Sequence, residues 1–176
     1  DDIDSISITS SQSAAEITAL TAEADDNAAL VDASGMSAAQ ITAVHGARAK
    51  INASGLTDLT LTSSQTAAEI GTLLTAGAVA NASVSVNANS MSTAQLVAVN
   101  VGTAKIAANG ITGAVALDAN GGGIDAAVVT SLLGKTDAGA VVTVAADGTV
   151  NTAVLEALSG SIAKVDNITG LTLTAT

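Results

Sequence analysis

The stretch "LTLTSSQTAAEI" at residues 59–70 decides the fold, because it places a strand signal directly before a helix start. Leucine and threonine alternate in its first four residues, and this period of two is typical of a β-strand. Thr66 and Glu69 then form a capping box, in which the hydroxyl accepts from a free backbone N–H and the carboxylate reaches back to the cap. We therefore expect the chain to leave a strand and begin a helix at Thr66.

The same phrase occurs earlier as "SSQSAAEI" at residues 10–17, which is 53 positions before its second copy. A second type of box, with glutamine in place of glutamate, begins at Ser37 and again at Ser92. In the last third of the chain, cap-type residues stand at the same places with different neighbours. Six short helices are therefore expected, with the N-caps Ser13, Ser37, Thr66, Ser92, Asp125 and Asn151.

A short run that alternates Ile, Val or Leu with Ser, Thr or Asn precedes every cap, beginning with "SISIT" at residues 5–9. These runs recur every 23 to 31 residues, and the last is "LTLTAT" at residues 171–176. A strand followed by a short helix at this spacing is typical of an α/β repeat solenoid, in which short parallel strands alternate with short helices. The "AKI" segments favour a further short strand on alternate coils. A compact layered α/β domain is the alternative.

The whole chain, residues 1–176, is interpreted as a single repeat array. Three lysines in similar segments mark a long repeat, because Lys50, Lys105 and Lys164 are 55 and 59 residues apart. The approximate units are residues 5–55, 56–110 and 111–170, with residues 171–176 starting a further unit.

Both ends of the sequence favour association with further repeats. The segment "DDIDSISIT" has neither an initiator Met nor a basic and apolar leader, so we expect a mature product or an excerpt. Solenoid ends expose unpaired backbone unless they are capped. We therefore expect the partners to be identical copies or neighbouring repeats, with "LTLTAT" of one module pairing onto "SISIT" of the next.

The composition excludes several classes of function. There is no Phe, Trp or Tyr, so the core consists of small aliphatic side chains that suit thin, regular layers. There is also no Cys, which excludes disulfides and thiolate chemistry. Five basic and 16 acidic residues give a net charge of -11, which argues against nucleic-acid binding. No apolar stretch is long enough to predict membrane insertion.

Few residues suggest catalysis or cofactor binding. His45 is the only histidine, and no G-x-S-x-G motif accompanies it, so a surface position near a helix end is the favoured interpretation. The run "ANGGGIDAA" at residues 119–127 lacks the lysine of a phosphate-binding loop and is interpreted as a connection between strand and helix. We expect no enzyme activity and no catalytic or cofactor-binding residue.

Calcium is the one metal that the sequence suggests, and only weakly. Carboxylates gather near the N-terminus and in the turn after the first expected helix, and calcium prefers several oxygen ligands. Neither an EF-hand loop nor a Gly-Asp nonapeptide series is present. The calcium candidates are Asp1, Asp2, Asp4, Asp25 and Asp26, and solvated acidic turns are the alternative.

Units such as "INASGLTDLTLTSSQTAAEI" and "VSVNANSMSTAQLVAVN" resemble the Ala/Thr/Ser-rich repeats of giant bacterial cell-surface, S-layer or adhesin proteins, including cyanobacterial ones. The resemblance implies an extracellular or cell-surface location and a non-enzymatic structural role in a fibre, sheath or surface layer. An adhesin module that binds a glycan or a protein ligand is the alternative, although the absence of aromatic residues removes the usual stacking platforms for sugars. Binding of ice or a mineral surface is a further alternative, for which no strict Thr-x-Thr ladder is present.

Overall fold

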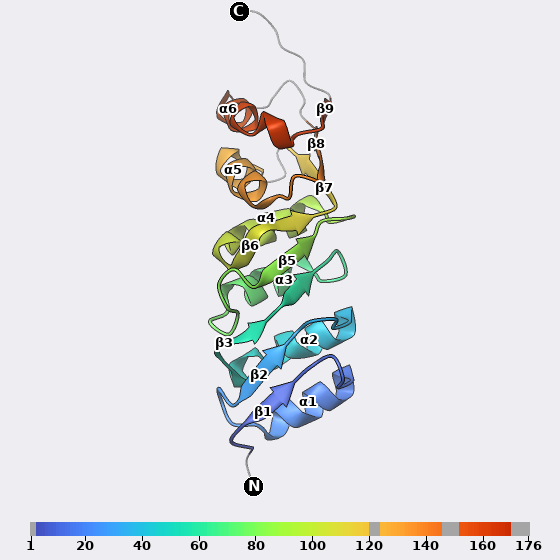
Figure 1. Ribbon diagram of the computed structural model, residues 1–176, viewed down its shortest axis with the longest axis vertical. Helices are drawn as coiled ribbons and strands as arrows, with labels where there is room; N and C mark the ends of the chain where they lie inside the picture. Colours follow the sequence, from blue (N-terminus) through green and yellow to red (C-terminus); the bar gives the residue numbers. More distant parts are fainter. Residues whose placement is uncertain (1–2, 120–123, 146–151, 170–176) are drawn as a thin grey trace, which may run out of the picture.

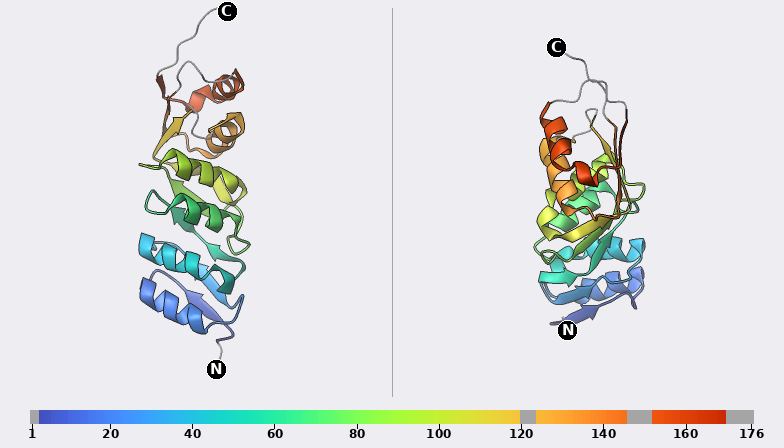
Figure 2. Two further views of the ribbon diagram at one scale, coloured as in Figure 1. Left: turned by 180° about the vertical axis from the view of Figure 1, so that it is seen from behind. Right: turned by 45° about the horizontal axis from the view of Figure 1, so that its top comes forward.

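The computed structural model describes residues 3–119, 124–145 and 152–169. Within these ranges the chain is an α/β protein, in which six helices alternate with nine strands that form three small parallel sheets. Figure 1 shows an elongated molecule in which helices and strands each stack along the long axis, with α5 and α6 to the left of the strands at the top and α1 and α2 to the right at the bottom. The two views of Figure 2 confirm that the N-terminal and C-terminal elements lie at opposite ends of the long axis.

The elements follow one another in the order that the repeat predicts. The helices are α1 (Ala14–Glu23), α2 (Ala38–Gly46), α3 (Ala67–Thr75), α4 (Thr93–Val101), α5 (Ala126–Lys135) and α6 (Thr152–Gly160). The strands are β1 (Ile6–Ile8), β2 (Ala29–Asp32), β3 (Ile51–Thr57), β4 (Leu59–Leu61), β5 (Val84–Asn87), β6 (Ile106–Thr112), β7 (Ala114–Asp118), β8 (Val141–Ala145) and β9 (Asn167–Thr169). The sheets have the orders β1-β2-β3, β4-β5-β6 and β7-β8-β9.

Helix starts lie where the sequence predicts them. The four complete capping boxes form, with Ser13, Ser37, Thr66 and Ser92 each accepting from the backbone N–H three residues on. At α5 the side chain of Asp125 accepts from the N–H of Val128 at 2.9 Å. The predicted sixth cap, Asn151, lies outside the described residues.

The predicted further strands after the "AK" segments are confirmed. A 3-10 turn follows each even-numbered helix at Arg48–Lys50, Thr103–Lys105 and Ile162–Lys164, and β3, β6 and β9 come after these turns. The run "LTLTAT" at residues 171–176 lies outside the described residues.

Backbone hydrogen bonds connect the three sheets. Leu56, near the end of β3, forms a parallel bridge with Val79, which precedes β5, and Ile111 in β6 forms the same bridge with Thr136. The N–H of Leu56 donates to the carbonyl of Ala78 at 2.8 Å. Strand β3 therefore pairs with β2 along one edge and with the next unit along the other.

Small aliphatic side chains fill the space between the helices and the strands. The fourth residue of each odd-numbered helix is fully buried, because Ile17, Ile70 and Val129 are each 0% exposed. The burial of one such side chain stabilises the fold by about 1.5–3 kcal/mol. Regular layers thus replace the aromatic residues that most cores of this size contain.

Equivalent positions in successive units share unusual backbone conformations. Eight described residues have a positive φ, and they fall into four pairs whose members are 55 residues apart in the sequence. Most are Gly, Asn, Asp or Ser, which tolerate this region best, but Ala82 adopts φ 55° where Asn27 adopts φ 61°. The pairs are Asn27 with Ala82, Gly35 with Ser90, Ser54 with Asn109, and Asp58 with Gly113.

The glutamines of the "SSQ" phrase and of the second type of capping box connect the starts of α1 and α3 to the even-numbered helices that follow them. The Gln65 side chain accepts from the N–H of Thr62 at 2.8 Å and folds the loop before α3. The side-chain N–H of Gln95 then donates to the carbonyl of Ser63 at 3.1 Å and to that of Gln65. In the first unit Gln12 and Gln40 make the same contacts.

The three repeated lysines contact the segment that precedes them in the stack of strands. The ammonium group of Lys105 donates to the carbonyl of Val79 at 2.6 Å, that of Lys164 donates to the carbonyls of Leu133 and Thr136, both at 2.8 Å, and Lys50 pairs with Asp26 at 3.1 Å. Leu133 lies in the last turn of α5, where carbonyl groups lack partners within the helix. Each "AK" segment therefore connects one strand–helix unit to the previous one.

Candidate functional site

The structure places His45 in the last turn of α2, as predicted. Its carbonyl accepts from Arg48 Nη1 at 3.0 Å, and its side chain is partly buried. Within the described ranges the His45 Nε2 atom is buried and has no hydrogen-bond partner. The Glu69 carboxylate lies close enough to His45 for the histidine to lower the pKa of Glu69.

The acidic residues proposed as calcium ligands do not form a metal-binding group in the described part of the chain, where no cluster of three or more candidate ligands occurs. Asp4 and Asp25 lie at the N-terminal end of the molecule, and Asp26 instead pairs with Lys50 at 3.1 Å. The remaining candidates, Asp1 and Asp2, lie outside the described residues.

The glycine run before α5 is described only in part, because residues 120–123 lie outside the described ranges. Ile124 is 5% exposed and packs into the core, and Asp125 caps α5. A carboxylate at this helix start occupies the place that a phosphate would take in a phosphate-binding loop.

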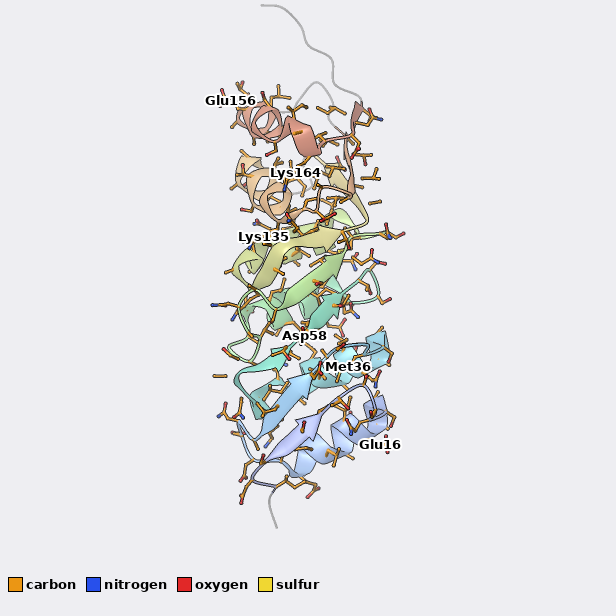
Figure 3. The ribbon with its side chains drawn as sticks, viewed as in Figure 1. Glu16, Met36, Asp58, Lys135, Glu156 and Lys164 are labelled. Atoms are coloured by element: carbon orange, nitrogen blue, oxygen red, sulfur yellow. The ribbon has the colours of Figure 1, made fainter. Side chains whose placement is uncertain are left out.

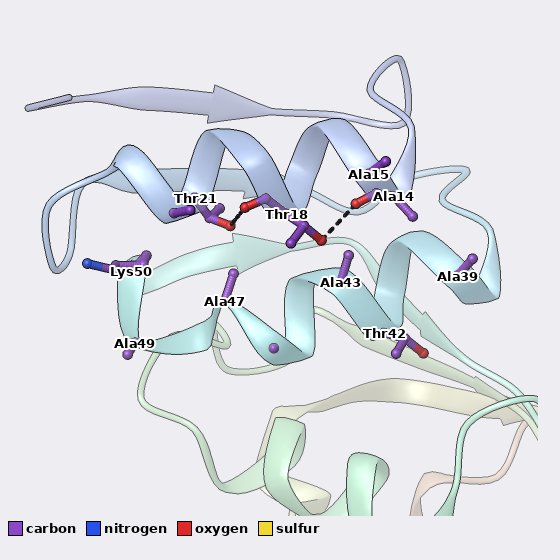
Figure 4. A pocket seen from close by; sticks show the side chains of 12 residues that line it. Ala14, Ala15, Thr18, Thr21, Ala39, Thr42, Ala43, Ala47, Ala49 and Lys50 are labelled. Carbon is purple, nitrogen blue, oxygen red and sulfur yellow. Dashed lines mark hydrogen bonds between the residues drawn. The ribbon is translucent and has the colours of Figure 1, made fainter. Parts of the chain in front are cut away.

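A groove of about 680 Å³ runs between α1 and α2 and is lined mainly by alanine and threonine (Figure 4). The Thr18 hydroxyl donates to the carbonyl of Ala14 at 2.9 Å, and the Thr21 hydroxyl donates to that of Ile17 at 2.7 Å. These hydroxyls are satisfied by their own helix, which favours a gap in packing over a binding site. In the second unit, Leu74 stands at the place of Thr21 and is 1% exposed.

Apolar side chains are uncovered at the N-terminal end of the stack. Leu20 in α1 is partly exposed, whereas the equivalent residues Leu73 and Leu132 are each 0% exposed because a preceding coil covers them. Ile6 in β1 is also partly exposed, whereas its equivalent Leu59 is 0% exposed. We refer to Ile6 and Leu20 as the N-terminal face.

The C-terminal end shows the same property. Leu155 in α6 and Ile168 in β9 are partly exposed, whereas their equivalents Leu96 and Ile111 are each 0% exposed. Val165 is likewise partly exposed, and its equivalent Ile106 is 0% exposed. We refer to Leu155, Val165 and Ile168 as the C-terminal face. Each face consists of positions that are buried in the core of other units but are not covered by a neighbouring unit here.

The two glutamates of the capping boxes have lowered pKa values. The backbone N–H of Ser13, and then its hydroxyl, donate to the Glu16 carboxylate and hold its pKa below the ordinary value of 4.5. Thr66 lowers the pKa of Glu69 in the same way, and the Thr42 hydroxyl and His45 lower it further. Both carboxylates are therefore favoured in their charged form.

These shifts predict acid sensitivity of the helix starts. A carboxylate whose pKa is lower in the folded chain stabilises the fold fully above its unfolded pKa, and this contribution is lost as the pH falls through the folded pKa. Between about pH 6 and about pH 3, the free energy of unfolding of the wild type should fall more than that of the double variant E16Q/E69Q, as measured by urea unfolding. Parallel losses in the two proteins would contradict this assignment.

No helix in the described ranges has both the length and the apolarity that crossing a lipid bilayer requires. Comparison of the chain with known protein families, with curated proteins and with solved structures finds no match. The N-terminal face and the C-terminal face are the candidate functional surfaces, because their apolar side chains are partly exposed where the equivalent side chains of other units are buried.

Sequence reasoning predicted association at the two ends, through the strand runs at residues 5–9 and 171–176, but it did not identify the exposed side chains of α1 and α6 or the contacts that join successive units. One available signal was the third helical residue, which is Glu in α1 and α3 but Gln in α2 and α4. A glutamate side chain at this position only accepts hydrogen bonds, whereas a glutamine side chain can also donate them to a neighbouring unit.

Proposed function

We propose that the chain is a non-enzymatic structural module of an extracellular surface protein, an α/β repeat solenoid that joins further copies or repeats end to end. The observation that carries the proposal is the pair of uncovered faces, because the same positions are sealed wherever a neighbouring coil is present. A fibre, sheath or surface layer built from such modules would use both faces in every joint. The extracellular location is supported by the resemblance of the Ala/Thr/Ser-rich units to bacterial surface repeats.

The strands at the two ends support pairing in a joint of this kind. Ile168 occupies in β9 the position of Leu56, whose outer edge pairs with Val79 of the next coil. At the other end, Ile3 forms with Ala24 the bridge that Leu56 forms with Val79. In a joint that repeats the internal geometry, Ile168 of one copy therefore pairs with Ala24 of its neighbour. It takes the place that Ile3 of that neighbour occupies when the joint is absent. The exchange replaces one parallel bridge by another of the same kind.

The proposal predicts that a polar residue on the N-terminal face weakens assembly. In Leu20→Gln an amide would have to be buried where a leucine is covered in the other units, and burial of the leucine contributes about 1.5–3 kcal/mol. We expect the dissociation constant to rise by at least about tenfold, as measured by sedimentation velocity over a range of protein concentrations.

A matched control lies on the side of the stack. Leu30 in β2 is 51% exposed but does not belong to either end, so Leu30→Gln should leave the dissociation constant unchanged. Circular dichroism and thermal unfolding would verify that both variants retain the fold. Equal weakening of association by the two substitutions would refute end-to-end assembly.

A further inference from the structure

The internal junctions between units show how an even-numbered helix meets the odd-numbered helix that follows it. Where α2 meets α3, the Thr42 hydroxyl donates to Glu69 Oε1 at 3.0 Å. Thr42 is the fifth residue of α2 and Glu69 is the third residue of α3. These two helix positions therefore face each other at a junction.

The second internal junction uses the same positions with different chemistry. The fifth residue of α4 is Val97 and the third residue of α5 is Val128. Val128 is 6% exposed, and Val97 is partly buried and packs against the core. A hydroxyl with a carboxylate at one junction is thus replaced by two apolar side chains at the other, and both combinations are compatible.

The ends of the chain present a third combination. The fifth residue of α6 is Glu156 and the third residue of α1 is Glu16, and both are exposed. Figure 3 shows the two glutamates at opposite ends of the molecule. We infer that a joint between two copies brings Glu156 of one against Glu16 of the next, so that repulsion between carboxylates limits end-to-end assembly. This inference rests on the proposed function.

Within the described ranges, no lysine or arginine side chain is free to compensate this repulsion. All five basic side chains are already engaged: Lys50 with Asp26, Arg48 with a carbonyl in its own turn, and the remaining lysines with backbone carbonyls. At the first junction His45 lies near Glu69, but the equivalent residue of α6 is Ser159. Glu23 lies seven residues after Glu16 and so adds negative charge to the same face of α1.

Substitution of Glu156 tests the inference, because this residue is exposed and does not take part in a capping box. Glu156→Thr copies the Thr42–Glu69 junction, and Glu156→Gln removes the charge with the least change in shape. We expect each to lower the dissociation constant of the self-association by about tenfold at pH 7 and low salt, where charges are least screened. Sedimentation equilibrium would give both constants.

The control variant Asp32→Asn removes one negative charge elsewhere. Asn87 occupies the equivalent position of the second unit and accepts from the N–H of Asn89 as Asp32 accepts from that of Ser34, so the fold is kept. Unchanged association of Asp32→Asn, together with tightening by both Glu156 variants, supports the joint. If Leu20→Gln weakens assembly but the Glu156 variants behave like Asp32→Asn, the inference fails and the proposed function stands. If neither the wild type nor Glu156→Thr associates, both fail.

Discussion

Replacement of Gln95 by glutamate is expected to lower the free energy of unfolding by about 2–4 kcal/mol at neutral pH. The Gln95 side chain is 9% exposed and makes two sets of hydrogen bonds. Its Oε1 accepts from the N–H of Ser92 at 2.8 Å and completes the capping box, while its amide group donates to the carbonyls of Ser63 and Gln65. A glutamate at this position can still accept from the N–H of Ser92. Its second carboxylate oxygen, however, would lie against the two carbonyl oxygens and repel them.

The loss should shrink as the pH falls, because a protonated carboxyl group can donate to one of those carbonyls. Urea unfolding at several pH values would measure the difference from the wild type. The matched control is Glu16→Gln, which replaces a carboxylate by an amide instead of an amide by a carboxylate. Glu16 is exposed, and its side chain only accepts hydrogen bonds within its own capping box. That variant should lose much less, and comparable losses at the two sites would mean that the inter-coil contacts of Gln95 contribute nothing.

Gly102→Ala is expected to cost about 1–3 kcal/mol through overpacking. A Cβ atom at position 102 would lie 2.3 Å from Leu74 Cβ and 3.0 Å from the Leu74 carbonyl oxygen, so α3 and the end of α4 would have to move apart. The backbone of Gly102, with φ -122°, is open to alanine, so the cost comes from the contact and not from conformation. Denaturant unfolding would measure it.

In the first unit Thr21 and Ala47 occupy the places of Leu74 and Gly102, and both residues line the open groove between α1 and α2, so the helices are packed less closely there. Gly102→Ala combined with Leu74→Gly, which removes the Cβ atom that the new methyl group would meet, should destabilise the fold by less than the sum of the two single changes. Gly46→Ala is the control, since a Cβ there meets nothing within 4 Å and should stabilise α2 by about 0.5–1 kcal/mol. Strict additivity in the double variant would show that the two positions are independent.

The local fold was predictable because the chain specifies it with short-range signals. Ser13 and Thr66 cap their helices through residues three positions away, and alternation in runs such as residues 59–62 indicates the strands without knowledge of the rest. The bridge of Leu56 to Val79 was not predictable in this way. It depends on how far β3 continues past its pairing with β2, which no local pattern encodes.

The candidate site was less accessible from sequence for a different reason. Leu20 and Leu73 occupy equivalent positions of the repeated sequence, which gives no sign that their surroundings differ. Only the three-dimensional structure shows that Leu20 is partly exposed while Leu73 is 0% exposed. The carboxylates near the N-terminus drew attention to calcium because they cluster in sequence, yet Asp26 is engaged by Lys50 from the following coil. Proximity along the chain is a poor guide to which charges meet in space.

The facing positions at the two internal junctions have a consequence for the order of modules in a longer array. Thr42 donates a hydrogen bond to Glu69 at the first junction, whereas Val97 and Val128 occupy the equivalent helix positions at the second. A module ending like α4 that met one beginning like α3 would place the Glu69 carboxylate against a valine and remove the hydrogen bond that Thr42 donates to it, which is unfavourable. We therefore expect the pair of side chains at a junction to influence which unit can follow which in such an array.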